Sequence, residues 1–487
     1  MLFNSLSFII FFPVVTFLYY ISSQKLRLII LLTASCIFYM FFIPYYIFIL
    51  FFLILVDFFA GIFIGKSKGS KRKLFLFISI LCNIGILFSF KYFNFFSSSV
   101  NQIAHFLHWN YPPFLLSVIL PIGLSFHTFQ SLSYVIEVYK KKQKPEKNLL
   151  IYALYVMFYP QLVAGPIERP QQMLPQFYKK IKLDEVNLTI GLQRILIGLF
   201  KKVVIADRLA ILVNQVYATP HDYIGLPLII ATIAFSIQIY CDFSGYSDIA
   251  IGTAKVMGFN LVENFNYPYF ARSISDFWRR WHMSLYSWFR DYVYIPLGGN
   301  RVSFKRHIVN ILIVFGITGL WHGAAWTFII WGFLHGMFLS IETISQKLFY
   351  KKHIANKLVQ AVQLSVTFLL VSFAWVFFRA NSLSDALYIL GAFPKGLGAF
   401  FISIFRHDVR ALNLYTFHQA NGLGLSYTQL QIVCTAILFL LLYEVLCVKG
   451  IFPKIPQILK WIIFISMTLS IINLGSVNLL PFIYFQF

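Results

Sequence analysis

Long apolar runs recur along the whole chain, and short clusters of lysine and arginine separate them. A helix needs about 20 apolar residues to cross the hydrocarbon core of a bilayer. Runs of this length, or nearly so, start close to Ser5, Leu28, Tyr45, Leu74, Phe114, Leu149, Thr189, Ile224, Ile311, Trp326, Val359, Leu387, Ile432 and Trp461. Because Pro and Gly interrupt several runs, the pattern predicts an all-α polytopic membrane protein with about 11 to 13 membrane helices, some of them tilted or re-entrant.

The composition agrees with this class. Of the 487 residues, 59% are hydrophobic and 12% are charged, whereas about 25% are charged in a soluble domain. The net charge of +23 does not indicate nucleic-acid binding, because the basic residues lie between apolar runs, as in the cytoplasmic loops of membrane proteins. These clusters are Lys66–Lys73, Lys140–Lys147, Lys179–Lys182 and Arg301–Arg306.

Neither a second domain nor a metal site is expected. No linker rich in Gly, Ser or Pro divides the chain, so we predict one integral domain over residues 1–487. The five cysteines form no CxxC pair and most lie within apolar runs, which indicates buried apolar side chains, not metal ligands. No internal repeat stands out, which weakens a transporter interpretation.

One histidine lies inside an apolar run. The segment Gly319–Trp326 (GLWHGAAW) places His322 in a run from Ile311 to Leu339 that has no Asp, Glu, Lys or Arg. A titratable side chain in such a position is costly and is a functional-site hypothesis. The small residues around it allow close approach of another backbone and leave room for a substrate. The alternative is a core histidine that hydrogen-bonds a neighbouring helix.

The middle of the chain, residues 242–306, has no clean apolar run and carries many charged and aromatic residues. Polar backbone at membrane depth must be buried or line a cavity, so we expect short, tilted helices around one. Residues Ser273–Tyr294 have a helical apolar face, and Ser273 or Ser275 can cap the start of this helix. An amphipathic helix at the membrane interface is the alternative to a helix that lines the cavity.

Two arginines in this helix, Arg279 and Arg280, could form a cationic mouth for a phosphorylated donor, because guanidinium groups match phosphate geometry. His282 would then point inward. Asp242–Asp248 (DFSGYSD) has the residue types of a hydrolase triad but no GxSxG elbow. Its alternative is a helix break at Gly245.

Seven stretches resemble, in order along the chain, motifs of the membrane-bound O-acyltransferase (MBOAT) superfamily and its bacterial alginate O-acetyltransferase branch. They are Pro121–Gln130, Tyr159–Ile167, Asp242–Asp248, Glu263–Pro268, Phe277–His282, Ile295–Arg301 and Gly319–Gly323. The resemblance implies a many-helix enzyme around a central funnel through the bilayer of the cell inner membrane, with a catalytic core of about residues 115–345. It further implies an acyl donor from the cytoplasm and an acceptor on the outer side.

The resemblance places the superfamily's histidine on His322 and the branch's second histidine on His282. The expected donor is acetyl-CoA or another acyl thioester, with no bound cofactor. The expected acceptor is a cell-surface polysaccharide such as alginate, reached in some relatives through an extracytoplasmic acetyltransferase partner. Residues expected to bind substrate are Asp242, Ser244, Arg279, Arg280, Trp281 and Trp321.

A mechanism follows from the residue types. An imidazole near neutral pKa can take the proton of an attacking hydroxyl, so His322 is predicted to be the general base. His282 would orient a substrate or stabilise the oxyanion. Two other functions stay open at this point. One is transfer of D-alanine or a longer acyl chain to teichoic acid, peptidoglycan, lipid or peptide, and the other is a transporter or flippase without covalent chemistry.

Overall fold

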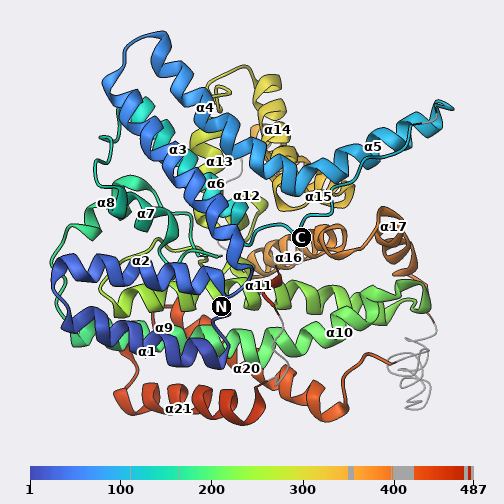
Figure 1. The fold of residues 1–487 in the computed structure, drawn as a ribbon. Coiled ribbons are helices and arrows are strands. Elements are labelled where there is room, and N and C mark those ends of the chain that lie inside the picture. The colour runs from blue at the N-terminus through green and yellow to red at the C-terminus, as the bar shows by residue number, and fades with distance from the viewer. Residues whose placement is uncertain are drawn as a thin grey trace. The chain divides into compact units, whose positions relative to one another are not determined.

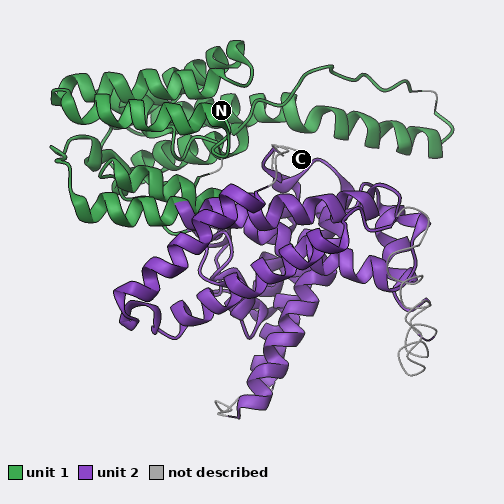
Figure 2. Cartoon of the chain, turned by 90° about the horizontal axis from the view of Figure 1, so that it is seen from below, with its two compact units in different colours: residues 1–195, 246–263 green, residues 196–245, 264–487 purple. Residues whose placement is uncertain are grey.

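The computed structural model describes residues 1–109, 111–163, 165–348, 356–395, 398, 422–475 and 481–483, and these residues form helices and connecting loops without a strand. The chain divides into two compact units (Figure 2). Unit 1 contains residues 1–195 and 246–263, and unit 2 contains residues 196–245 and 264–487. The prediction of a single domain is not tested by this division and stays a prediction.

Unit 1 contains helices α1 to α8, most of which coincide with the N-terminal apolar runs (Figure 1). They are α1 (Leu6–Ile21), α2 (Gln24–Met40), α3 (Ile47–Lys66), α4 (Ser70–Leu87), α5 (Phe93–Phe106), α6 (Leu124–Tyr139), α7 (Leu149–Met157) and α8 (Pro170–Phe177). A buried carboxylate joins α3 to α4, because Asp57 Oδ1 accepts hydrogen bonds from Ser79 Oγ at 2.6 Å and from Asn83 Nδ2 at 3.0 Å. These bonds satisfy a charge that would otherwise be costly inside an apolar bundle.

Unit 2 holds every residue that the sequence proposes for the site. Its helices are α10 (Asp207–Ala218), α12 (Ile274–Trp278), α13 (Met283–Phe289), α14 (Phe304–His322), α15 (Trp326–Leu348), α16 (Lys357–Arg379), α17 (Leu383–Ala392), α20 (Tyr427–Val448) and α21 (Gln457–Leu474), with π-helical turns η3 (Phe200–Ala206) and η6 (Arg290–Tyr294). Helices α9 (Glu185–Leu199) and α11 (Leu226–Val256) each contribute residues to both units.

The predicted class, an all-α polytopic membrane protein, is confirmed. Eight helices within the described ranges are long and apolar enough to cross a membrane: Pro44–Lys66, Ser70–Phe106, Leu226–Val256, Phe304–His322, Trp326–Leu348, Lys357–Arg379, Tyr427–Val448 and Gln457–Leu474. The sequence suggested more spans because several apolar runs form shorter elements. The run from Leu149, for example, gives a helix of nine residues. A central funnel stays a prediction.

Helices α14 and α15 form a tight hairpin (Figure 1). Residues 323–325 connect them, and the backbones touch where glycines face the partner helix. A Cβ on Gly319 would lie 2.3 Å from the carbonyl oxygen of Phe328, and one on Gly332 would lie 2.2 Å from that of Phe315. The small residues therefore permit the close backbone approach that the sequence predicts.

We expect Gly319→Ala to destabilise the hairpin, because the new methyl group meets main-chain atoms that cannot rotate away. The matched control is Gly391→Ala in α17, where a Cβ would meet no atom within 4 Å and alanine favours the helix. Thermal unfolding of the detergent-solubilised protein should show a lower midpoint for Gly319→Ala alone. Equal midpoints for the two variants would contradict the close approach.

Helix α11 corrects one alternative drawn from the sequence. The chain runs helically through Asp242–Asp248, so the proposed helix break at Gly245 is wrong. Gly245 instead lets α11 pack closely against the backbone of α9, since a Cβ at this position would lie 2.7 Å from the carbonyl oxygen of Gly198.

Candidate active site

The segment Ser273–Tyr294 is not the single helix that its apolar face predicts. It divides into α12, α13 and the turn η6, and His282 lies at the break with left-handed backbone angles, φ 43° and ψ 53°. The neighbouring chain explains the break. The Asn266 N–H donates to the Arg280 carbonyl, and the Met283 N–H donates to the Asn264 carbonyl, both at 2.9 Å. These bonds take main-chain groups that a continuous helix would use.

Two smaller expectations about this segment are confirmed. Ser273 caps the start of α12, because its Oγ accepts a hydrogen bond from the Asp276 N–H at 3.1 Å. Residues 264–303 do form short helices. Its first part differs, since residues 242–256 belong to the long helix α11.

His282 is 1% exposed, and Asn264 fixes its orientation. The Asn264 side-chain oxygen lies 3.0 Å from His282 Nδ1, and it also accepts from Ser284 Oγ at 2.9 Å and from the Ser284 N–H at 3.3 Å. An oxygen that serves these donors accepts from His282 as well, so Nδ1 carries the ring proton and Nε2 carries the lone pair. Burial lowers the pKa of His282 well below its usual value, which keeps the ring neutral.

His322 is the last residue of α14 and is 3% exposed. Its ring packs against aromatic rings, with centroids 4.9 Å from Trp321, 4.8 Å from Trp331 and 5.3 Å from Phe378. The Trp321 ring also lies 6.2 Å from that of His282. The structure thus brings together three residues that the sequence proposed, His282, Trp321 and His322, in an apolar environment of low exposure.

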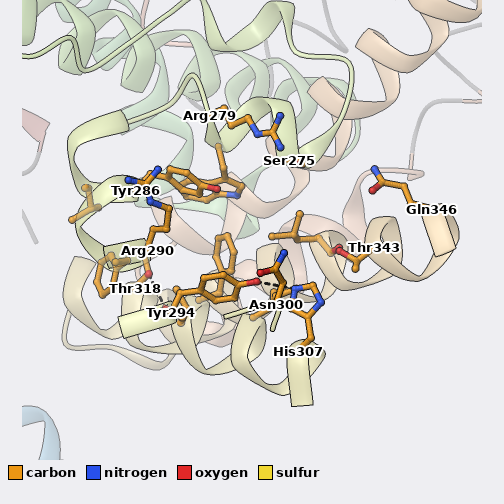
Figure 3. Close-up of a pocket in the computed structure, with 17 residues that line it drawn as sticks. Ser275, Arg279, Tyr286, Arg290, Tyr294, Asn300, His307, Thr318, Thr343 and Gln346 are labelled. Atoms are coloured by element: carbon orange, nitrogen blue, oxygen red, sulfur yellow. Dashed lines mark hydrogen bonds between the residues drawn. The ribbon is translucent and has the colours of Figure 1, made fainter. Parts of the chain in front are cut away.

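A cavity of about 380 Å³ lies between α12, α13, α14 and α15 (Figure 3). Arg279 and Arg290 line it together with His307 and Tyr294, and the Tyr294 hydroxyl lies 2.9 Å from His307 Nε2. The cavity wall continues along α14 to Thr318, one turn before His322. His282 and His322 are not among its lining residues.

The two arginines proposed for a phosphorylated donor differ in their surroundings. Arg279 lines the cavity and forms no ion pair with any residue that the structure describes. Arg280 instead pairs with Asp276, Nε to Oδ1 at 2.8 Å. Trp281 is fully buried and packs on Phe277 and Trp375, with centroids 5.5 and 5.2 Å away. These contacts favour Arg279 as a binding residue and support a packing role for Trp281.

Asp242 belongs to a buried cluster of charges. Lys202 Nζ, in the π-helical turn η3, lies 2.8 Å from Asp242 Oδ1 and 2.8 Å from Asp207 Oδ1. In the same turn, Lys201 Nζ lies 3.8 Å from Glu444 Oε1 on α20. The wider π-helical turn directs two consecutive lysines inward, and such turns recur at functional sites. These contacts support an anchoring role for Asp242.

Ser244, the other α11 residue proposed to bind substrate, is buried, and its hydroxyl has no hydrogen-bond partner among the residues described here. Its role stays a prediction. No group of three or more His, Cys, Asp or Glu side chains in the described ranges is placed to hold a metal ion.

Sequence reasoning missed two polar residues near the site. Asn264 lies in the stretch Glu263–Pro268, within which no residue was expected to act in the site. His335 lies 13 positions after His322, and on one continuous helix it would project about 140° away from it. The helix breaks at residues 323–325, so both rings pack on Trp331, His335 at 5.0 Å. His335 is fully buried, and neither ring nitrogen has a hydrogen-bond partner within the described part of the chain.

Comparison with known proteins defines the class. The sequence model of the MBOAT, membrane-bound O-acyltransferase, family matches residues 16–383. The chain therefore belongs to this family and is a multi-pass membrane O-acyltransferase. The matched range includes both histidines and all the proposed binding residues.

Individual relatives have different acceptors in their names. The chain is 38% identical over 392 residues to the probable alginate O-acetylase AlgI of Pseudomonas aeruginosa, which covers 79% of this chain and 73% of the relative. It is 37% identical to the peptidoglycan O-acetyltransferase of Helicobacter pylori, over 80% of this chain and 79% of the relative. It is 29% identical to the teichoic acid D-alanyltransferase of Bacillus subtilis, over 53% of this chain and 69% of the relative.

Proposed function

We propose that the protein moves an acetyl group from a cytoplasmic thioester, acetyl-CoA in the simplest case, across the cell inner membrane to hydroxyl groups of a cell-surface polysaccharide such as alginate. The observation that carries the proposal is the pair of buried imidazoles, His282 and His322, which both lie near the Trp321 ring. The similarity to alginate O-acetylases over most of the chain supports the acetyl group and the polysaccharide acceptor.

In the proposed reaction, His322 takes the proton of the acceptor hydroxyl as its oxygen attacks the thioester carbonyl. The tetrahedral intermediate then collapses to the ester, and the departing thiolate receives that proton. The tautomer of His282 narrows its role. Since Nε2 carries a lone pair, it can accept a hydrogen bond from a second hydroxyl of the acceptor, beside the one whose proton goes to His322, but it cannot donate one to an oxyanion. His282 therefore orients the acceptor.

The cavity lined by Arg279 suits the phosphorylated head of the donor, because a guanidinium that forms no ion pair with the described residues offers several donors to phosphate oxygens. We expect Arg279→Ala to raise the donor KM by about 10- to 100-fold, the range for loss of a charged hydrogen bond. Initial rates against acetyl-CoA concentration in isolated membranes measure this. The control is Arg280→Ala, since Arg280 is occupied by Asp276 and should leave KM nearly unchanged. Equal KM values in the two variants would contradict the assignment.

The acceptor can be tested in cells. Deletion of the gene for this protein should remove O-acetyl esters from the surface glycan. Nuclear magnetic resonance of the purified glycan detects this loss. Loss of O-acetyl groups from peptidoglycan would instead favour the function named for the Helicobacter pylori relative, and loss of D-alanine from teichoic acid the function named for the Bacillus subtilis relative. A requirement for a second, extracytoplasmic acetyltransferase would appear as accumulation of unmodified glycan when only that partner is removed.

A further inference from the structure

In the segment Pro481–Ile483, the first residue is exposed and the next two are buried in unit 2. Phe482 is 1% exposed and Ile483 is 3% exposed. The main-chain N–H of Ile483 donates a hydrogen bond of 2.9 Å to Asp242 Oδ2. A segment this far along the chain is therefore held by a carboxylate on α11, 241 positions earlier.

The anchor is itself fixed. The second oxygen of Asp242 lies 2.8 Å from Lys202 Nζ, and the same ammonium group binds Asp207. A buried carboxylate that accepts a hydrogen bond keeps its orientation, because no water is present to replace that bond if the carboxylate rotates. The Ile483 backbone is thus attached to a rigid point of the unit.

The segment reaches His282 through one aromatic ring. Phe482 packs on Phe243, with centroids 5.3 Å apart. The Phe243 and His282 rings form a T-shaped pair, with centroids 4.6 Å apart and an interplanar angle of 84°. The hydrogen bond to Asn264 fixes Nδ1 of His282, and the Phe243 ring restricts how the imidazole can pivot about that bond.

We propose that Pro481–Ile483 is a positioning element of the active site, anchored by Asp242 and holding Phe243 against His282. This inference rests on the proposed role of His282 in the reaction. Phe482 itself is not proposed to touch the acyl donor or the acceptor. It acts through Phe243, so its removal should disturb the orientation of the imidazole and leave the binding of the donor intact.

The test uses the full-length protein in isolated membranes. Phe482→Ala removes the ring, and Phe482→Leu keeps much of its volume. We expect Phe482→Ala to lower kcat about tenfold, because small displacements of positioned groups cost rate, while the donor KM stays within about twofold. Phe482→Leu should restore most of kcat. Because loss of a buried ring should lower the thermal midpoint of Phe482→Ala, kcat is expressed per amount of folded protein in the membrane, and Phe482→Leu should stay nearer the wild-type midpoint.

The anchor is tested by a matched pair. Ile483→Pro removes the N–H that donates to Asp242, whereas Ile483→Ala keeps it and shortens only the side chain. We expect Ile483→Pro to lose kcat like Phe482→Ala, and Ile483→Ala to lose far less. Equal losses in the two Ile483 variants, or an unchanged kcat in Phe482→Ala, would overturn the proposal.

A double variant separates positioning from general stability. If the segment acts through His282, adding Phe482→Ala to His282→Ala should cause no further loss of the residual rate, since coupled residues are not additive. A further tenfold loss would overturn the proposal. The result of this double-variant test does not depend on whether His322 is the general base. An active His322→Ala would refute the proposed base, while a Phe482 effect that disappears in the His282→Ala background would still support the segment's role.

Discussion

Replacement of His322 by alanine is expected to lower the rate of acyl transfer by about 10²- to 10⁴-fold, the contribution of a general base. The physical reason is that the rings of Trp321, Trp331 and Phe378, which pack on His322, have no group that could take the proton in its place. The measurement is release of free thiol from acetyl-CoA by the purified protein in the presence of an acceptor glycan. Donor KM should change little, since His322 does not line the Arg279 cavity.

The control for this variant is another histidine in the same unit. His221 is largely exposed and pairs with Asp385 at 3.2 Å, a surface contact worth at most about 1 kcal/mol. His221→Ala should keep the wild-type rate. Near-normal turnover by folded His322→Ala would refute the base assignment, and equal losses in both variants would indicate a general effect of the substitutions.

The second large effect is expected from Lys202→Ala. The change leaves Asp207 and Asp242 buried without their shared cation, and breaking a buried ion pair in this way costs about 3–5 kcal/mol. We expect less protein in the membrane and a clearly lower thermal midpoint after solubilisation, measured by fluorescence-detected size-exclusion chromatography.

A matched comparison tests the cause of that loss. Arg280→Ala breaks an ion pair of the same length between partly exposed side chains and should cost less than about 1 kcal/mol. A triple variant, Lys202→Met with Asp207→Asn and Asp242→Asn, removes the three charges together and should recover part of the stability. A triple variant less stable than Lys202→Ala would show that uncompensated charge is not the cause.

The membrane class and the buried position of His322 could be predicted because they depend on local features. Most long apolar runs form spanning helices, and a lone imidazole such as His322 stands out within one. The residue type of Arg279 also led to the expectation that it lines a binding cavity. The family resemblance contributed His282, whose neighbours in the sequence alone suggested only an amphipathic helix.

What could not be predicted depends on contacts between distant segments. The break at His282 arises from hydrogen bonds to residues 264–266, which helical periodicity does not reveal. Lys202 and Asp242 are 40 positions apart, and the anchoring of Ile483 spans most of unit 2. Ring orientation and tautomer at His282 likewise follow from Asn264, whose role only the three-dimensional arrangement shows.

The hairpin of α14 and α15 has a consequence for membrane topology. Its open end is basic, with Arg301, Lys305, Arg306 and Lys347, and Lys347 Nζ lies 4.0 Å from the centroid of the Phe304 ring across the two helices. The positive-inside rule predicts that this end faces the cytoplasm, and the tip that carries His322 would then point away from it. Helix α14 is about 28 Å long. A donor whose head is recognised among the basic residues therefore needs a long flexible arm, as in phosphopantetheine, to present its acyl carbon at the far end.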